Sequence, residues 1–143
     1  SRLHQRLVKE KGLFSNVNAY VTGDIDPGLF VVTGNLLPDT SVSQAESALW
    51  EELETLKTGP IESYELEKVR NKFESGVIFG EINVMNKAMN LGFYEMLGDV
   101  ELINREVGIH RSVTEDEIKQ VSGHIFVPRK STTLIYGSPH EKK

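Results

Sequence analysis

The change from a helical to an alternating pattern within the first 36 residues constrains the fold most. Leu3 and Leu7 lie four residues apart, as they would on one side of a helix, and Gly12 suits the left-handed position that ends one. Residues 16–22 then alternate between apolar and polar side chains, which predicts a half-buried strand. Its expected inward residues are Val17, Ala19 and Val21.

A second strand is expected directly after the first. Residues 23–28 read Gly-Asp-Ile-Asp-Pro-Gly, which is dense in turn formers, and residues 29–35 resume a strand pattern. The short connection predicts an antiparallel pair. Asp24 and Asp26 do not predict a calcium loop, because such a loop spreads its oxygen ligands over about a dozen residues and ends on a glutamate.

The rest of the chain is predicted to be mainly helical. Ser41 with Gln44, and Thr114 with Glu117, have the spacing of capping boxes at helix starts. Gly76 and Gly80 are expected to weaken the helix that contains them. We predict helices over residues 41–58, 63–82, 84–97, 99–106 and 114–127, and a last strand over 131–136.

The helix predicted over residues 84–97 is the least polar part of the chain and contains all three methionines. Met85, Met89 and Phe93 recur at helical spacing, and Met96 follows. Such a stripe can mark a copper site or an adaptable binding groove, but core packing is much commoner. We therefore predict that these methionines pack in the core.

Clustered strands followed by clustered helices indicate an α+β fold, with an antiparallel sheet covered on one face by helices. The length of 143 residues favours a single domain, which we place at residues 1–137. The charged end of the chain, residues 138–143, is predicted to be a disordered tail.

Composition excludes several classes of protein. The net charge of −5 argues against nucleic acid as a partner, because phosphate binding needs a basic surface. No apolar run is long enough to span a bilayer. The absence of cysteine excludes disulfides, thiolate metal sites and cysteine nucleophiles.

The first 14 residues, SRLHQRLVKEKGLF, resemble a block in the pitrilysin/insulinase-type zinc metallopeptidases and their processing-peptidase relatives. That block reads roughly S-R-L-x-Q-x-L-R-E-x-x-G-L-x-Y. The helix start at Thr114 and the STTLIYG segment at 131–137 resemble the usual end of a family half. The resemblance implies a metallopeptidase-half sandwich truncated at its N-terminus, since a complete half has strands before this block. The missing strands would leave a sheet edge exposed or filled by another chain.

Active family members bind zinc through H-x-x-E-H, whose two histidines share one helical face. The histidines here are His4, His110, His124 and His140, and no two are three to five residues apart. A zinc site built from distant histidines remains open as an alternative. We expect no cofactor in this chain and zinc in a partner half.

The resemblance also implies where a second catalytic contribution belongs. In active enzymes the C-terminal half supplies an arginine and a tyrosine seven positions apart, which stabilise the oxyanion. Alignment on Gly12 places Val8 and Ser15 at these positions, and a shift by one residue places Leu7 and Phe14 there. Neither alignment restores the pair, so no catalytic residue is predicted. Ser15 and Tyr20 remain speculative chamber residues.

The resemblance therefore implies an inactive domain of a zinc metallopeptidase. It would enclose a peptide chamber opposite a zinc-bearing half, in cis or in trans, without hydrolysing peptides itself. The alternative is a structural or assembly subunit, like the core proteins of respiratory complexes, with no peptidase partner. A third option is that Ser15 or Tyr20 assists catalysis. The family's bacterial members suggest the periplasm or cell envelope as the location.

Overall fold

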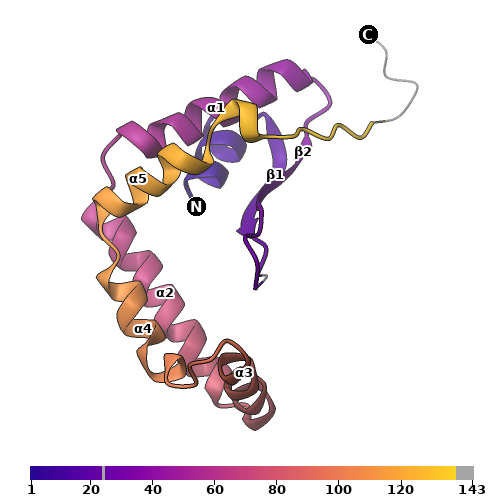
Figure 1. Cartoon of the computed structure of the whole chain (residues 1–143). Helices are drawn as coiled ribbons and strands as arrows, with labels where there is room; N and C mark the ends of the chain where they lie inside the picture. Colours follow the sequence, from indigo (N-terminus) through magenta and orange to yellow (C-terminus); the bar gives the residue numbers. More distant parts are fainter. Residues whose placement is uncertain (24, 138–143) are drawn as a thin grey trace. The chain divides into compact units, whose positions relative to one another are not determined.

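The computed structural model describes residues 1–23 and 25–137, which divide into two compact units. Within the described residues, unit 1 consists of residues 1–59 and 120–137, and unit 2 consists of Pro60–Lys119. Figure 1 shows the elements in chain order. The single domain over residues 1–137 stays a prediction. The predicted tail at 138–143 lies outside the described residues.

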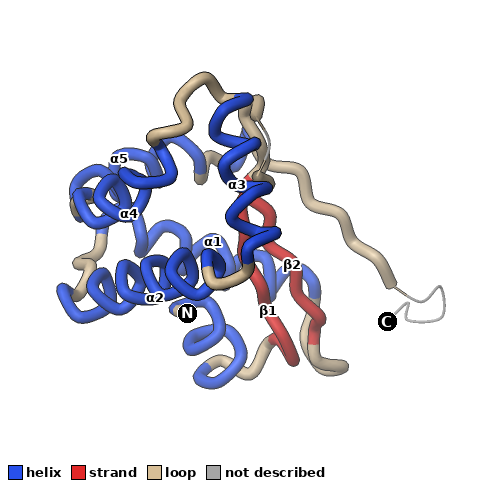
Figure 2. Tube along the Cα trace, turned by 90° about the horizontal axis from the view of Figure 1, so that it is seen from below, coloured by secondary structure: helices blue, strands red, loops and turns tan. Residues whose placement is uncertain are grey.

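Unit 1 is built around an antiparallel hairpin, as predicted. Strands β1 (Phe14–Val21) and β2 (Phe30–Leu36) pair with each other, and Figure 2 shows them in red. The first helix, η1 (His4–Glu10), has π geometry, which the sequence did not indicate. Gly12 follows it with φ of +59°, the left-handed conformation expected at this position. The hairpin and η1 confirm the predicted helix-strand-strand order.

A β-bulge at Ser15 sets which side chains of β1 face the core. Phe14 pairs with Leu36 and Asn16 pairs with Asn35, so β1 has one extra residue, Ser15, between two successive pairs. Phe14 and Val17 are three residues apart and would point to opposite faces of a regular strand. The extra residue at the bulge brings both side chains into the core.

The core of unit 1 lies between η1, the hairpin and helix α1 (Val42–Thr58). Leu7 is its only fully buried large side chain among the described residues, at 0% exposure. The remaining buried members of this cluster are Leu13, Phe14, Val17, Ala45 and Ala48. Ser41 caps α1 as predicted, because its Oγ accepts a hydrogen bond from the Gln44 backbone N–H at 3.2 Å.

The far half of β1 differs from the prediction. Ala19 and Val21 were expected to point inward, but both are exposed, and Val17 alone of the three is buried. The core cluster takes only Phe14 and Val17 from β1, although Val32 of β2, opposite Ala19, still packs against it. Burial along β1 therefore does not alternate, because an alternating sequence does not by itself supply a covering layer.

Helix α5 (Glu115–Ile125) contributes residues to both units and is followed by a short 3-10 helix, η2 (Pro128–Lys130). In unit 1, Phe126 is buried and its ring meets that of Phe30 edge to face, with centroids 4.9 Å apart. This aromatic pair attaches the segment that follows α5 to β2.

The strand predicted over residues 131–136 is wrong. These residues have no regular secondary structure, and Leu134 and Tyr136 are 92% and 99% exposed. A strand forms only where another strand satisfies its backbone groups. The sheet within the described residues contains β1 and β2 alone. The β-forming composition of this segment therefore lacks a strand to pair with.

Unit 2 contains helices α2 (Ser63–Glu81), α3 (Val84–Met96) and α4 (Leu102–Ser112). α2 continues through Gly76 and Gly80 and ends where it was expected to end, before Asn83. α4 extends to Ser112, beyond the predicted end at Glu106. None of the described helices combines the length and apolar character that a bilayer crossing requires.

Polar contacts attach α4 to α2. The Arg111 guanidinium donates from Nε to Glu74 Oε2 at 2.9 Å, from Nη1 to Glu67 Oε1 at 3.2 Å and from Nη2 to Asn71 Oδ1 at 3.0 Å. Arg70 of α2 donates from Nη2 to the backbone oxygen of Val113 at 2.7 Å. These contacts align the two helices.

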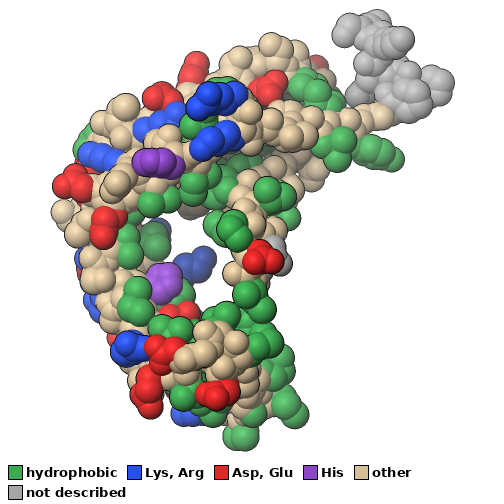
Figure 3. Space-filling view, in the orientation of Figure 1, with side chains coloured by type: hydrophobic (Ala, Val, Ile, Leu, Met, Phe, Trp, Pro, Cys, Tyr) green, Lys and Arg blue, Asp and Glu red, His purple; other side chains and the backbone are tan. Residues whose placement is uncertain are grey.

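The methionine stripe is not in a core, so that prediction is wrong. Met85, Met89 and Met96 are 67%, 64% and 64% exposed, and α3 has no buried residue. Figure 3 shows apolar side chains gathered over this helix. The three helices of unit 2 provide too few neighbours to cover both sides of α3. An apolar helix face predicts burial, but the covering surface must come from another element.

The capping box at the start of α5 gives a prediction for pH dependence. The backbone N–H and the hydroxyl of Thr114 each donate to Glu117 Oε2 at 2.8 Å, and the Glu117 N–H donates to Thr114 Oγ1 at 3.3 Å. The bond from the Thr114 backbone, followed by that from its hydroxyl, lowers the pKa of Glu117 below 4.5.

Because the pKa of Glu117 is lower in the folded state, its ionised carboxylate stabilises the fold fully above the pKa of the unfolded state. This stabilisation is lost as the pH falls through the pKa of the folded state. We expect Glu117→Gln to lower the thermal midpoint at pH 7, and the difference from wild type to shrink below about pH 4. Circular dichroism melts across this range would measure it. A difference that stays constant down to pH 3 would contradict the assigned role of the ionised carboxylate.

Candidate functional site

The described histidines do not form a metal site. His4 lies on η1, and the His110 ring of α4 stacks on Phe73 with centroids 3.5 Å apart. His124 Nδ1 lies 2.8 Å from the backbone oxygen of Gln120. Within residues 1–23 and 25–137, no group of three or more histidine, aspartate or glutamate side chains is placed to hold a metal ion. His140 lies outside these residues. The described side chains therefore do not fit a zinc ion.

The positions aligned with the family's arginine and tyrosine both lie in unit 1. Val8, on η1, packs its partly buried side chain against the core cluster. Ser15 is exposed at the bulge of β1, where its hydroxyl donates to the backbone oxygen of Asn35 at 3.2 Å. Val8 has no polar atom to offer a substrate, and the Ser15 hydroxyl stabilises the hairpin.

Tyr20, the other speculative chamber residue, lies opposite Val31 near the far end of β1 and is 52% exposed. Four residues of β1 separate it from Ser15, which lies at the bulge. Their assignment as chamber residues stays a prediction, and the structure brings neither beside a catalytic group.

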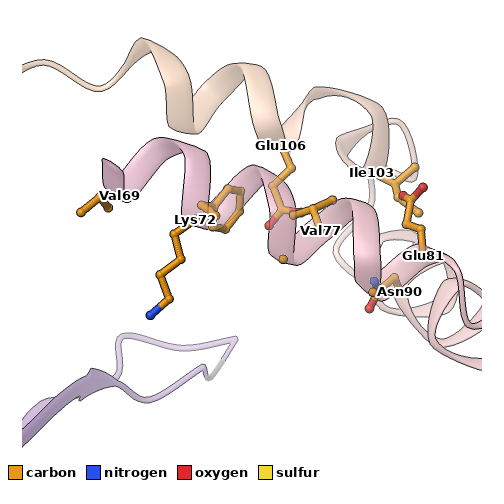
Figure 4. Close-up of a pocket in the computed structure, with 10 residues that line it drawn as sticks. Val69, Lys72, Val77, Glu81, Asn90, Ile103 and Glu106 are labelled. Carbon is orange, nitrogen blue, oxygen red and sulfur yellow. The ribbon is translucent and has the colours of Figure 1, made fainter. Parts of the chain in front are cut away.

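Unit 2 contains an open groove of about 530 Å³ that the sequence analysis did not predict. Seven of its ten lining residues come from α2, with Asn90 from α3 and Ile103 and Glu106 from α4. Figure 4 shows Glu106 extending from α4 towards α2, and Lys72 extending from α2 away from α4. The apolar surface comes from Val69, Phe73, Val77 and Ile103. Its volume lies in the range of small-molecule and peptide-side-chain sites.

Two glycines leave the middle of the groove open. Gly76 and Gly80 lie one turn apart on α2, and a Cβ built on either would meet no atom within 4 Å. The α2 backbone is therefore accessible to a ligand at this point. The sequence does contain a signal for this opening, because the two glycines share a helix face with Phe73 and Val77. By themselves, however, they predict only a weak point of the helix.

The charged residues of the groove are partly engaged. Burial, followed by a hydrogen bond to Glu106 and the negative charge of that carboxylate, raises the pKa of Tyr94 to about 12. Tyr94 is therefore a neutral donor to the Glu106 carboxylate at physiological pH. Glu81 lies 3.6 Å from Lys87 Nζ in an exposed pair, which contributes little to stability.

These features define an α+β chain with a two-stranded sheet, an open groove between helices and, within the described residues, no metal site. The sequence profile of the Peptidase M16 inactive domain matches residues 1–73. This match covers just over half of the chain, and the chain belongs to that family, the pitrilysin type that its first 14 residues resemble. It is an inactive peptidase domain, the non-catalytic part of a proposed zinc protease. Comparison with curated proteins finds no match.

Solved structures support the fold. The inactive peptidase domain of a proposed zinc protease from Bordetella parapertussis is 24% identical, with a TM-score of 0.79, and the match covers 90% of this chain and 70% of that one. A proposed zinc protease from Bordetella pertussis Tohama I is 26% identical, with a TM-score of 0.77 and coverages of 90% and 71%. A protease from Helicobacter pylori is 20% identical, with a TM-score of 0.80 and coverages of 89% and 30%. The α+β fold and its helical cover are thereby confirmed.

Proposed function

We propose that this inactive domain forms one wall of a peptide chamber, opposite a zinc-bearing half that performs the hydrolysis. The observation that carries the proposal is the match of residues 1–73 to the inactive domain of a peptidase family. Zinc belongs to the partner half in this proposal, and the peptide is held between the two. The partner is in cis or in trans, and the periplasm or cell envelope is the proposed location.

The local chemistry supports a role in enclosure rather than catalysis. Oxyanion stabilisation needs preorganised donors near the reacting carbonyl. Val8 has no donor, and the hydroxyl of Ser15 donates within the hairpin. A wall that excludes water and limits substrate size needs neither residue to act on the substrate.

Reconstitution with the zinc-bearing half from the parent gene or operon tests the proposal. We expect the two purified chains to associate, and a quenched fluorescent peptide to be cleaved by the pair and not by either chain alone. Sedimentation and fluorescence on the same mixture measure association and turnover together. Equal cleavage by the partner alone, or no such partner, would favour the structural-subunit alternative.

The same assay separates enclosure from assisted catalysis. Ser15→Ala and Tyr20→Phe remove only hydroxyl groups from exposed positions of β1. If the domain is only a wall, we expect both variants to support turnover at the wild-type rate. A lower kcat with unchanged association would show that one hydroxyl takes part in catalysis.

A further inference from the structure

We propose that the groove of unit 2, centred on Gly76 and Gly80 of α2, binds a peptide segment in which apolar side chains are accompanied by lysine or arginine. The inference rests on the proposed function, because it names the class of peptide that such a wall would hold. Three separate features carry it: the open glycine floor, the charge of unit 2 and the exposed methionines.

The shape of the groove fits side chains of a peptide. Its floor is α2 backbone at Gly76 and Gly80, where no atom lies within 4 Å of a built Cβ. Phe73, Val77 and Ile103 supply apolar contacts around this floor. Lys72 and Glu81 are nine residues apart on α2, which corresponds to about 14 Å along the helix. An extended peptide spans that distance with about four residues.

The charge of unit 2 selects a basic partner. Residues 60–119 contain 12 acidic and seven basic side chains, a net charge of −5 that equals the net charge of the whole chain. In the groove itself, Glu106 comes from α4 and Glu81 from the end of α2, and Lys72 is the one basic residue of the lining. A lysine or arginine of a bound peptide could pair with either carboxylate of the groove, and the negative charge of unit 2 would attract it.

The methionines extend the apolar surface beside the groove. Asn90 of α3 is part of the groove wall, and the same helix exposes Met85, Met89 and Met96. Unbranched methionine side chains adapt to partners of different shape. The structure therefore points to recognition of a class of peptides rather than of one sequence.

Fluorescence anisotropy with the full chain tests this inference. The probe is a fluorescein-labelled octapeptide of alternating leucine and lysine, and the comparison peptide alternates leucine and glutamate. Gly76→Leu and Gly80→Leu fill the groove in open space and replace a poor helix former by a good one. We expect each variant to weaken binding of the leucine-lysine peptide about tenfold or more.

Gly108→Leu is the matched control. Gly108 lies on α4 outside the groove, and a Cβ there also meets nothing within 4 Å. The Gly108→Leu variant should bind the leucine-lysine peptide as tightly as wild type does. Circular dichroism should show that all three leucine variants are helical. Glu106→Gln should weaken binding of the leucine-lysine peptide and should not weaken binding of the leucine-glutamate peptide.

The inference is overturned if the wild-type chain does not bind the basic peptide, or if Gly76→Leu and Gly108→Leu bind it equally well. It is also overturned if Glu106→Gln has no effect, or if sedimentation shows a dimer that Gly76→Leu dissociates, since a second copy would then fill the groove. If the reconstituted pair cleaves peptides but the groove binds none, only the proposed groove site is refuted. If the groove binds the peptide but the partner cleaves equally well without this chain, only the proposed chamber is refuted.

Discussion

Replacement of Leu7 by alanine is expected to lower the free energy of unfolding by about 3 kcal/mol. Leu7 is fully buried, and its side chain lies in the cluster where η1, β1 and α1 meet. Alanine would remove the transfer free energy of the lost carbons and leave a cavity that the neighbouring elements close only partly. Urea unfolding followed by the fluorescence of Trp50, the single tryptophan, reports on unit 1 because Trp50 lies on α1.

The matched control is Leu134→Ala. Leu134 is the same residue type but is 92% exposed, so its truncation should change the unfolding free energy by less than about 0.5 kcal/mol. Equal midpoints for Leu7→Ala and Leu134→Ala would show that η1 is not part of the cooperative core of unit 1.

Replacement of Gly34 by valine is expected to destabilise unit 1 by about 2 kcal/mol, although valine is a better strand former than glycine. A Cβ at Gly34 would lie 2.7 Å from Phe14 Cδ1, 2.8 Å from its Cε1 and 3.2 Å from the Asn16 backbone oxygen. The Phe14 ring is buried and occupies the space that a side chain at Gly34 would take. Either the ring or the β2 backbone must move. The same tryptophan-monitored urea unfolding measures the loss.

Two further variants separate overpacking from a general effect on the hairpin. Gly23→Val lies in the hairpin connection, where a Cβ meets nothing within 4 Å, and should be close to wild type. Phe14→Leu combined with Gly34→Val should cost less than the sum of the two single changes, since the smaller side chain makes room. Strict additivity would contradict the assigned contact between Phe14 and Gly34.

Local patterns predicted the elements whose contacts are close in sequence. The alternating residues of β1 and β2 and the turn between them were enough for the antiparallel hairpin, and the Ser41 and Thr114 capping boxes located two helix starts. The π geometry of η1 and the bulge at Ser15 were not predicted. Both features depend on the packing of Leu7 and Phe14 in one common core. No local sequence pattern gives information about that packing.

The candidate sites divide in the same way. Histidine spacing and the residues at Val8 and Ser15 argued against catalysis from the sequence, and the family match assigns the chain to an inactive peptidase domain. The groove was missed because it needs α2, α3 and α4 together. Gly76 and Gly80 by themselves suggest a weak helix, and only beside Ile103 and Glu106 do they become the floor of a groove.

The sequence by itself determined the class of this protein: a non-catalytic α+β domain whose first hairpin, helix starts and lack of a histidine pair can be seen in its residues. The tertiary structure decided burial. It left the methionine stripe of α3 and the strand-like residues 131–136 exposed, and it placed Phe14 rather than Val21 in the core. The physical reason is that propensity and periodicity are properties of one segment, whereas burial requires a second surface.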